Sequence, residues 1–369
     1  MTMKILVVGA GISGATIANL ASSDHKVTVI DSSDHIAGNC YDYRDGNGIM
    51  IHRYGSHIFH TSNQEVWDFL SQFTGFNTYM HRVIGLVEGN LVPIPFNFDT
   101  IHAVFPETLA ERIERKLLDR YGYGTKIPIM EFMKQDDEDL RFLAEYVYEN
   151  VFLHYTEKQW GYSPDDMDGA VTARVPVYLS RDPRYFQDRF QGIPLEGYTK
   201  MIERMLDDPN IEVRLNTSFS DIEPKTYDHI FFTGPVDELM GYRFGQLPYR
   251  SVHFRMETHD RQHYQPNAVV NYPNNYDFTR IHEYKYYLDD ISDRTVIAKE
   301  YSEDFVPGRN DRFYPVPKKE NEELYSKYLD AVRGEYPNMH PLGRLGDYRY
   351  YDMDKAVARA MAVYREVLG

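Results

Sequence analysis

The opening β-α-β pattern constrains the fold of this chain more than any other stretch. An apolar run at residues 4–8 leads into G-A-G-I-S-G at residues 9–14, which precedes a run of small and apolar residues. A second apolar run, residues 26–30, ends at Asp31. In such a unit the glycines permit a tight turn, let the backbone approach a pyrophosphate and let the helix pack on the strand. The order and spacing therefore predict a dinucleotide site in which Asp31 accepts ribose hydroxyls.

Size, charge and cysteine content exclude several classes of protein. The chain has 369 residues, more than a usual single domain, so we expect two or three domains. Its net charge of −16 argues against nucleic acid or an anionic membrane as a partner, so a few local arginines must bind any phosphate. Cys40 is the only cysteine, which excludes an internal disulfide or a multi-cysteine metal centre. Without a signal-peptide pattern or an apolar stretch of membrane-spanning length, we expect a cytoplasmic protein with no membrane insertion.

Beyond the opening unit, the pattern predicts helices followed by an antiparallel sheet. Apolar residues recur at helical spacing after Pro106 and again after the acidic residues 136–139, which indicates two amphipathic helices. Alternating runs with turn residues between them predict a sheet with one wetted face. These runs lie at residues 251–256, 268–272, 280–286 and 295–301. Runs at 211–215 and 229–235 predict strands that return to the first domain, and a last helix is expected to end near Leu368.

Further motifs follow in order along the chain. They are Y-G-x-H-I-F-H-T at residues 54–61, Y-T-x-K-Q-W-G at 155–161, R-x-P-V at 174–177, Y-F-x-D-R-F-Q-G-x-P at 185–194 and G-R-L-G-x-Y-x-Y-x-D-M at 343–353. This set resembles the bacterial UDP-galactopyranose mutase family over nearly the whole chain. The resemblance implies an FAD-dependent isomerase that interconverts UDP-galactopyranose and UDP-galactofuranose, with no net redox. In that family the flavin is active when reduced, and its N5 forms a covalent adduct with the sugar as UDP leaves.

The resemblance also implies the fold class and the partners. We expect an α/β protein with a Rossmann-like FAD-binding domain, a small helical domain and an antiparallel β-sheet domain, and substrate between them. The FAD-binding domain is expected to be discontinuous. The expected ranges are 1–80, 195–245 and 325–369 for this domain, 98–165 for the helical domain, and 81–97, 166–194 and 246–324 for the sheet domain. Expected partners are a nucleotide-sugar substrate and an external reductant such as NAD(P)H, with a homodimer possible, in a route that supplies galactofuranose to cell-surface polysaccharides.

The implied chemistry assigns roles to residues of the substrate site. A departing diphosphate gathers negative charge, which calls for arginines with bidentate reach in a site shielded from water. Arg174 and Arg280 match the two diphosphate-binding arginines of the family, and Arg174 precedes a segment expected to act as a lid. Tyr155 matches the residue on which the nucleobase stacks. The other expected substrate-binding residues are Phe152, Thr156, Trp160, Tyr185, Arg250, Asn271, Tyr314 and Tyr350. Taken alone, each arginine also fits a solvated surface charge, and Phe152 and Tyr155 also fit core packing.

The residues expected to contact FAD lie in the glycine turn and in three later loops. They are Gly9, Gly11, Ser13, Gly14, Asp31, Gly38, Asn39, Cys40, His57, Ile58, Gly343, Arg344, Tyr350, Asp352 and Met353. His57 matches a histidine loop against the flavin ring, and it joins the two arginines as a candidate catalytic residue. A metal site of His57 and His60 is not expected, because no further ligand set is evident nearby.

Several positions depart from the family pattern and leave the substrate open. Ala37 stands where a glycine is usual, Val151 where an aromatic residue is usual, His154 where a glycine is usual, and Asp277-Phe278 where Pro-Tyr is common. UDP-N-acetylgalactosamine or a dTDP-deoxysugar are therefore alternative substrates for the same chemistry. Two other classes are a flavin oxidase of the amine-oxidase type, which shares the opening pattern, and a dinucleotide-binding module without catalysis.

Overall fold

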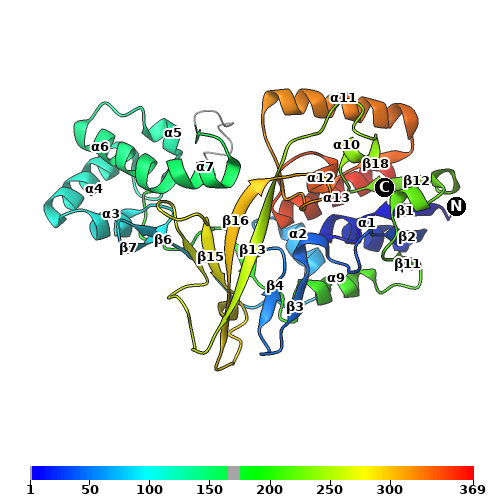
Figure 1. The fold of residues 1–369 in the computed structure, drawn as a ribbon, viewed down its shortest axis with the longest axis horizontal. Helices are drawn as coiled ribbons and strands as arrows, with labels where there is room; N and C mark the ends of the chain where they lie inside the picture. Colours follow the sequence, from blue (N-terminus) through cyan, green and yellow to red (C-terminus); the bar gives the residue numbers. More distant parts are fainter. Residues whose placement is uncertain (1, 165–174) are drawn as a thin grey trace. The chain divides into compact units, whose positions relative to one another are not determined.

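The computed structural model describes residues 2–164 and 175–369 and has a mixed α/β fold, whose two larger sheets are a parallel one and a largely antiparallel one (Figure 1). The predicted fold class is therefore confirmed. The chain forms two compact units. Unit 1 comprises Met1–Tyr79, Asp188–Tyr249 and Arg312–Gly369, and unit 2 comprises Met80–Gln187 and Arg250–Asp311. The finer division into three domains stays a prediction.

Unit 1 is built on a parallel sheet with the strand order β11-β2-β1-β12-β18 among the described residues. Its strands are β1 (Lys4–Val8), β2 (Lys26–Ile30), β11 (Ile211–Arg214), β12 (His229–Phe232) and β18 (Met339–Pro341). Leu6 of β1 lies between Thr28 and Ile230, its partners on the two neighbouring strands. The opening β-α-β pattern thus forms the centre of a sheet that later segments of the chain complete.

Helices and short strands surround this sheet. The helices of unit 1 are α1 (Ile12–Ser22), α2 (Gln64–Leu70), α9 (Tyr198–Leu206), α10 (Val236–Leu239), α11 (Lys319–Glu335), α12 (Gly343–Gly346) and α13 (Met353–Val367). Its remaining elements are η1 (Gly38–Cys40), β3 (Asp42–Arg44), β4 (Met50–His52), β5 (Phe59–Thr61), β10 (Phe190–Gly192), η4 (Phe219–Asp221), η5 (Pro224–Thr226) and β17 (Tyr314–Pro315). The helix α1 packs closely against α13 and α9 because its buried face carries small residues, Ala15, Ala18 and Ala21.

Unit 2 contains the second sheet, whose strands in this unit follow the order β13-β16-β15-β14-β6-β7. They are β6 (Val83–Val87), β7 (Asn90–Ile94), β13 (Tyr249–His259), β14 (Val269–Asn271), β15 (Arg280–Glu283) and β16 (Thr295–Asp304). The pairing is antiparallel, as the alternating pattern predicted, except that β14 runs parallel to β6. The parallel pair is formed where the β6–β7 hairpin, from an earlier part of the chain, joins the sheet beside β14. No tight turn connects β6 to β14, so their directions need not alternate.

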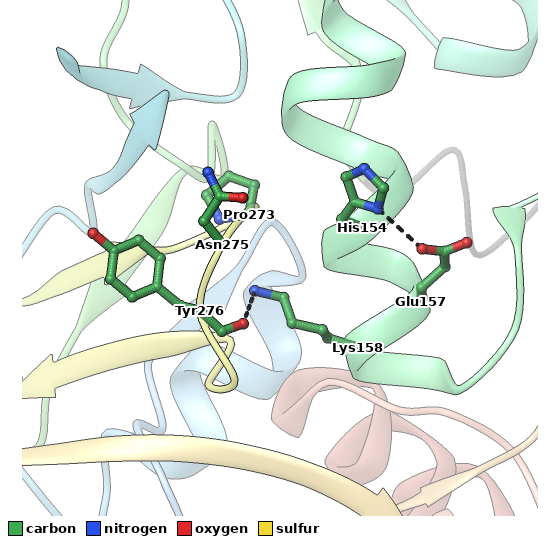
Figure 2. Close-up of a pocket in the computed structure, with 6 residues that line it drawn as sticks. All are labelled: His154, Glu157, Lys158, Pro273, Asn275 and Tyr276. Carbon is green, nitrogen blue, oxygen red and sulfur yellow. Dashed lines mark hydrogen bonds and ion pairs between the residues drawn. The ribbon is translucent and has the colours of Figure 1, made fainter. Parts of the chain in front are cut away.

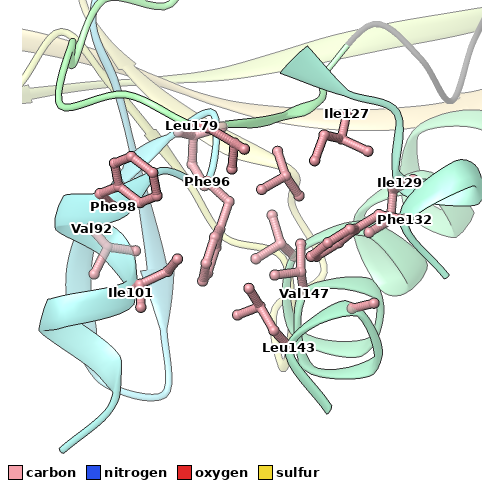
Figure 3. Close-up of a cluster of buried hydrophobic side chains, with 14 of the residues drawn as sticks. Val92, Phe96, Phe98, Ile101, Ile127, Ile129, Phe132, Leu143, Val147 and Leu179 are labelled. Carbon is pink, nitrogen blue, oxygen red and sulfur yellow. The ribbon is translucent and has the colours of Figure 1, made fainter. Parts of the chain in front are cut away.

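The helices of unit 2 enclose a hydrophobic cluster (Figure 3). They are α3 (Phe98–Val104), α4 (Glu107–Tyr121), α5 (Ile129–Phe132), α6 (Glu138–Val147), the π-helical segment η2 (Tyr148–Leu153) and α7 (His154–Trp160), with the short elements β8 (Lys126–Ile127), β9 (Val177–Tyr178) and η6 (Tyr284–Tyr286). The two amphipathic helices predicted from the sequence are α4 and α6. The backbone amides of Asp139 and Leu140 donate to the side chain of Asp137, which caps α6.

Candidate active site

The glycine turn between β1 and α1 has the shape that a pyrophosphate requires. A Cβ atom on Gly14 would lie 1.9 Å from the Gly9 carbonyl oxygen, so close packing of α1 on β1 demands glycine. A Cβ atom on Gly11 would meet only the Cα of Gly38, at 3.8 Å. Among the described residues no side chain caps the N-terminus of α1, where Gly11 is the N-cap. The open backbone and the uncapped amides together fit an anion at this helix end.

Asp31, at the end of β2, is fixed beside the same turn. Its Oδ2 accepts a hydrogen bond from the Ala10 backbone amide at 2.8 Å. Its Oδ1 accepts from the amide of Ser33 at 2.9 Å and from the Ser33 hydroxyl at 2.6 Å. Since each carboxylate oxygen has two lone pairs, Oδ2 retains the capacity to accept a ribose hydroxyl.

The short turn after β2 brings further predicted residues to the glycine turn. Gly38 lies beside Gly11, and Ala37 forms a bridge with Gly11 while holding a left-handed backbone with φ of +75°. The Sγ of Cys40 lies 3.6 Å from the Sδ of Met353, at the start of α13. Burial raises the pKa of Cys40 to about 12, so its thiol stays protonated.

His57 is held as a neutral imidazole of one defined tautomer. Its Nδ1 lies 2.8 Å from the Gly55 carbonyl oxygen, which can only accept, so Nδ1 carries the hydrogen and Nε2 is an acceptor. Burial, together with the positive charge of Arg344 and the nearby His52, lowers the pKa of His57 to about 3. His60 is paired with Asp188, its Nδ1 lying 2.8 Å from the carboxylate. Within residues 2–164 and 175–369, no cluster of His, Cys, Asp or Glu could hold a metal ion.

The last motif returns to the glycine turn and adds a cation beside two stacked aromatic rings. A Cβ atom on Gly343, which has φ of +80°, would lie 3.2 Å from the Ser13 hydroxyl, so the two motifs are in contact. The guanidinium carbon of Arg344 lies 5.5 Å from the ring centroid of Tyr314 and 5.1 Å from that of Tyr350. The two rings stack with centroids 5.6 Å apart. All the predicted FAD residues lie in unit 1, and Asp352 is the N-cap of α13.

Unit 2 aligns three polar side chains in one row across its sheet. Asn271 of β14 is the register partner of Arg280 on β15, which is the register partner of Glu300 on β16. The Nε of Arg280 lies 3.1 Å from Glu300 Oε1. The Nε2 of His282 lies 2.9 Å from the other carboxylate oxygen, and Thr279 donates its hydroxyl to Oε1.

This network makes Glu300 a fully charged buried partner of Arg280. Burial alone would raise the pKa of Glu300, whose side chain is 4% exposed, but Arg280, His282 and Thr279 lower it to about 2. Burial lowers the pKa of His282 despite the carboxylate, so His282 is neutral and donates its Nε2 hydrogen. Arg280 is therefore oriented from one side by a carboxylate that stays ionised at every physiological pH.

An aromatic ring and an unsatisfied acceptor accompany this row. The guanidinium carbon of Arg280 lies 5.8 Å from the ring centroid of Tyr155, in α7. Asn271 is only 9% exposed. Its Oδ1 is buried and has no hydrogen-bond partner within the described part of the chain. Such a buried acceptor is expected to bind a donor from a ligand. Thr156 and Trp160 are buried in α7, and Phe152 belongs to the hydrophobic cluster.

The other predicted substrate residues are placed differently. Arg250 donates from Nε to the Gln159 carbonyl oxygen at 2.9 Å and from Nη2 to the Lys158 carbonyl oxygen at 3.2 Å, so it caps the C-terminus of α7. Tyr185 packs its ring against Phe186, with centroids 4.9 Å apart. Arg174 lies outside the described residues.

Sequence reasoning missed two groups of the site. Glu300 and His282 lie in strands that the alternating sequence pattern predicts. Nothing in the local sequence indicated that their side chains are close to Arg280. Lys158 lies within a recognised motif, yet its part in the site was not predicted. Its three backbone partners lie more than a hundred residues further along the chain, so only the fold could reveal them.

Comparison with known proteins identifies the relatives of this chain. A family model described as UDP-galactopyranose mutase matches residues 150–350, and one described as an NAD(P)-binding Rossmann-like domain matches residues 7–73. The chain is 38% identical to a probable UDP-galactopyranose mutase of Klebsiella pneumoniae, over 99% of this chain and 94% of that one. It is 35% identical to a dTDP-fucopyranose mutase of Escherichia coli, over 97% and 96% respectively. A crystal structure of reduced UDP-galactopyranose mutase has the same fold, with a TM-score of 0.74 at 17% identity, and the match covers 100% of this chain and 94% of that one.

Proposed function

Because this chain belongs to the UDP-galactopyranose mutase family of isomerases, we propose that it interconverts UDP-galactopyranose and UDP-galactofuranose with no net redox, using reduced FAD. One observation carries the proposal beyond family membership. The half-buried Arg280, with its ionised partner Glu300, lies beside the unsatisfied Oδ1 of Asn271 and against the ring of Tyr155. A cation, an acceptor and an aromatic face are what a uridine diphosphate group requires.

The residues of unit 1 fit FAD as the cofactor. The backbone between Gly11 and Gly38 is open to a pyrophosphate, and Asp31 Oδ2 can accept a ribose hydroxyl. FAD held there would, in its reduced form, supply a nucleophilic ring nitrogen for chemistry at the anomeric carbon of the sugar. His57 would present a neutral imidazole with an acceptor nitrogen, which does not take up a proton in the physiological range.

The side chains of unit 2 would bind and stabilise the nucleotide. As the bond between the anomeric carbon and the diphosphate breaks, negative charge accumulates on UDP, and Arg280 would stabilise that charge. Arg174 is proposed as the second arginine of this group. The nucleobase would stack on Tyr155, and Asn271 Oδ1 would accept an N–H from the base or an O–H from the ribose.

Product analysis tests this function. The purified protein, reduced with dithionite, is incubated with UDP-galactofuranose, and the nucleotides are separated by chromatography. We expect conversion to UDP-galactopyranose, no conversion by the oxidised protein and no stoichiometric hydrogen peroxide. Absence of the pyranose product would refute this substrate, and peroxide formed in step with turnover would favour a flavin oxidase.

A second substrate class is supported by the E. coli dTDP-fucopyranose mutase, whose identity to this chain is close to that of the Klebsiella protein. The same incubation is therefore run with the furanose form of dTDP-fucose and with UDP-N-acetylgalactosamine. Faster turnover of the dTDP sugar would keep the chemistry and change the proposed specificity.

The remaining properties are proposals that follow from the family. We propose an external reductant such as NAD(P)H, a cytoplasmic location and a homodimer, each of which is open to direct measurement. In the described part of the chain, no helix combines the length and apolar character needed to cross a bilayer.

A further inference from the structure

The side-chain ammonium of Lys158, in α7, donates hydrogen bonds to three backbone carbonyl groups of a loop that is distant in sequence. The Nζ atom donates to the carbonyl oxygens of Tyr272 at 2.5 Å, Phe278 at 3.1 Å and Tyr276 at 3.2 Å. An ammonium has three hydrogens and no acceptor, so all three donors are used. Without this cation, three carbonyl dipoles would converge on one another with no partner.

The same three residues also close the loop with their side chains. The ring of Tyr272 lies 4.8 Å from that of Tyr276 and 4.9 Å from that of Phe278, and the latter two rings are 5.3 Å apart. The Tyr272 amide donates to the Thr279 carbonyl oxygen at 2.9 Å, which closes the base of the loop. Residues 273–278 therefore form a compact turn with an aromatic exterior and a lysine ammonium at its centre.

This loop joins two residues of the proposed substrate site. Asn271 immediately precedes its base, and Arg280 follows Thr279 at its other end. Lys158 itself lies one helical turn from Tyr155, on the same helix. The lysine therefore connects the helix that carries the aromatic ring to the strands that carry the guanidinium and the unsatisfied amide oxygen.

A pocket and a longer hydrogen bond lie beside this connection. An open pocket of about 540 Å³ lies between α7 and the loop, and Figure 2 shows the lysine reaching across it to the Tyr276 carbonyl group. The pocket is lined by His154, Glu157, Lys158, Pro273, Asn275 and Tyr276. A second hydrogen bond, from the side-chain Nδ2 of Asn274 to the carbonyl oxygen of Asn150 in η2, is longer, at 3.3 Å.

The charge of Lys158 is retained in this setting. Burial lowers the pKa of Lys158 to about 8, and Asp277, one of the departures from the family pattern, acts in the opposite direction. The lysine is thus mainly protonated at neutral pH and keeps all three of its donors.

We propose that Lys158 is a positioning residue, which acts through the 273–278 loop to set Arg280 and Asn271 relative to Tyr155 for nucleotide binding. The inference rests on the proposed function for its ligand, a uridine or thymidine diphosphate group. Lys158 need not touch the substrate, so its loss should weaken binding of the nucleotide more than it slows the chemical step.

Three variants of the holoenzyme test this role. Lys158→Met keeps the length of the side chain and removes the donors. Lys158→Arg restores a cation with several donors. Lys134→Met makes the same change at an exposed lysine of unit 2 that pairs only with Glu131 among the contacts shown by the structure.

For Lys158→Met we expect the Kd of UDP by calorimetry and the KM of the nucleotide sugar to rise about ten-fold, with kcat within about three-fold of the parent. Amide hydrogen exchange at Tyr272 and Thr279 should accelerate. Lys158→Arg should recover a large part of the affinity, and Lys134→Met should match the parent. If Lys158→Met does not fold, Asn274→Ala, which removes the longer hydrogen bond, should give smaller changes in the same direction.

The outcomes separate this proposal from the proposed function. Unchanged UDP affinity in Lys158→Met, whether or not amide exchange in the loop becomes faster, would overturn the positioning role. Turnover of the nucleotide sugar by the parent would still uphold the proposed function. Weaker binding of UDP or dTDP and a looser loop, in a parent that converts no nucleotide sugar, would uphold the positioning role and overturn the function. A parent that binds neither nucleotide would overturn both.

Discussion

The glycine turn of unit 1 and the Arg280 row of unit 2 are each proposed to bind a diphosphate group, and they are built from different parts of the chain. The turn is made of backbone, and its shape depends on residues that lack a side chain. A Cβ atom on Gly14, for example, would lie 1.9 Å from the Gly9 carbonyl oxygen. The row is made of side chains from three strands, and a buried carboxylate orients its cation. The first arrangement is local in sequence, whereas the second exists only in the folded sheet.

This difference has energetic consequences. The turn offers neutral amides at a helix N-terminus, so it buries no charge when the cofactor is absent. The row places a half-buried guanidinium beside a buried carboxylate, and the charge of the carboxylate depends on the guanidinium for compensation. Substitutions in the turn should therefore act through steric fit, and substitutions in the row should act through electrostatics.

The largest effect is expected from two matched glycine substitutions in the turn. Gly14→Ala would place a methyl group 1.9 Å from the Gly9 carbonyl oxygen, so we expect destabilisation by roughly 3 kcal/mol or more and little folded holoenzyme. Gly11→Ala meets nothing closer than 3.8 Å, so it should fold normally and lose affinity for FAD. Flavin absorbance and thermal unfolding measure both effects. Equal flavin content in Gly11→Ala and the parent would contradict a backbone-built cofactor site.

In the row, Arg280→Ala should keep FAD bound and lower kcat/KM by about 30-fold to several thousand-fold, equivalent to about 2–5 kcal/mol. Glu300→Gln retains the cation, removes its ionised partner and should give a smaller loss. Steady-state kinetics with the nucleotide sugar, alongside flavin content, provides the measurement. A rate for Arg280→Ala near that of the parent would exclude the proposed diphosphate role.

Because the folded protein lowers the pKa of His57, its free energy of unfolding should vary with pH in the acid range. The folded protein holds this pKa at about 3, below the usual 6.5, so between these values the unfolded chain binds more protons than the folded protein. The free energy of unfolding should therefore fall as pH decreases from 6.5 towards 3, by at most about 1.4 kcal/mol per pH unit from this group. Denaturant unfolding of the parent and of His57→Gln, from pH 7 to pH 4.5, compares the slopes. Identical slopes would show that His57 is not held neutral.

The smallest effect is expected at Ala37, one of the departures from the family pattern. Its φ of +75° places an alanine in the left-handed region, which glycine adopts without strain. Ala37→Gly should stabilise the protein by about 0.5–1 kcal/mol, because relief of strain exceeds the added freedom of the unfolded chain. Chemical denaturation measures this change, and a lower stability for the glycine variant would contradict it.

The fold was predictable where local pattern determines structure. The β-α-β unit follows from its apolar runs and glycines, and α4 and α6 follow from apolar residues at helical spacing. The π-helical segment Tyr148–Leu153 and the parallel pairing of β14 with β6 were not predictable, because both depend on how distant segments pack.

The candidate site divides in the same way. The sequence and the family motifs directed attention to Gly11, Asp31 and Arg280, and the structure locates each of them, although their roles stay predictions. Glu300 and Lys158 gave no such signal. A carboxylate in an alternating strand and a lysine in a short helix resemble ordinary surface residues until the fold supplies their partners.

The most direct test of the central claim follows the bond between the sugar and the diphosphate. UDP-galactopyranose is prepared with a heavy oxygen isotope in the position that bridges the anomeric carbon and the β-phosphorus, and it is incubated with the dithionite-reduced protein. We predict that the label spreads to the non-bridging positions of the β-phosphate, faster in the parent than in Arg280→Ala. Conversion of the sugar with the label retained in the bridge would show that UDP never leaves, and would contradict the proposed role of Arg280.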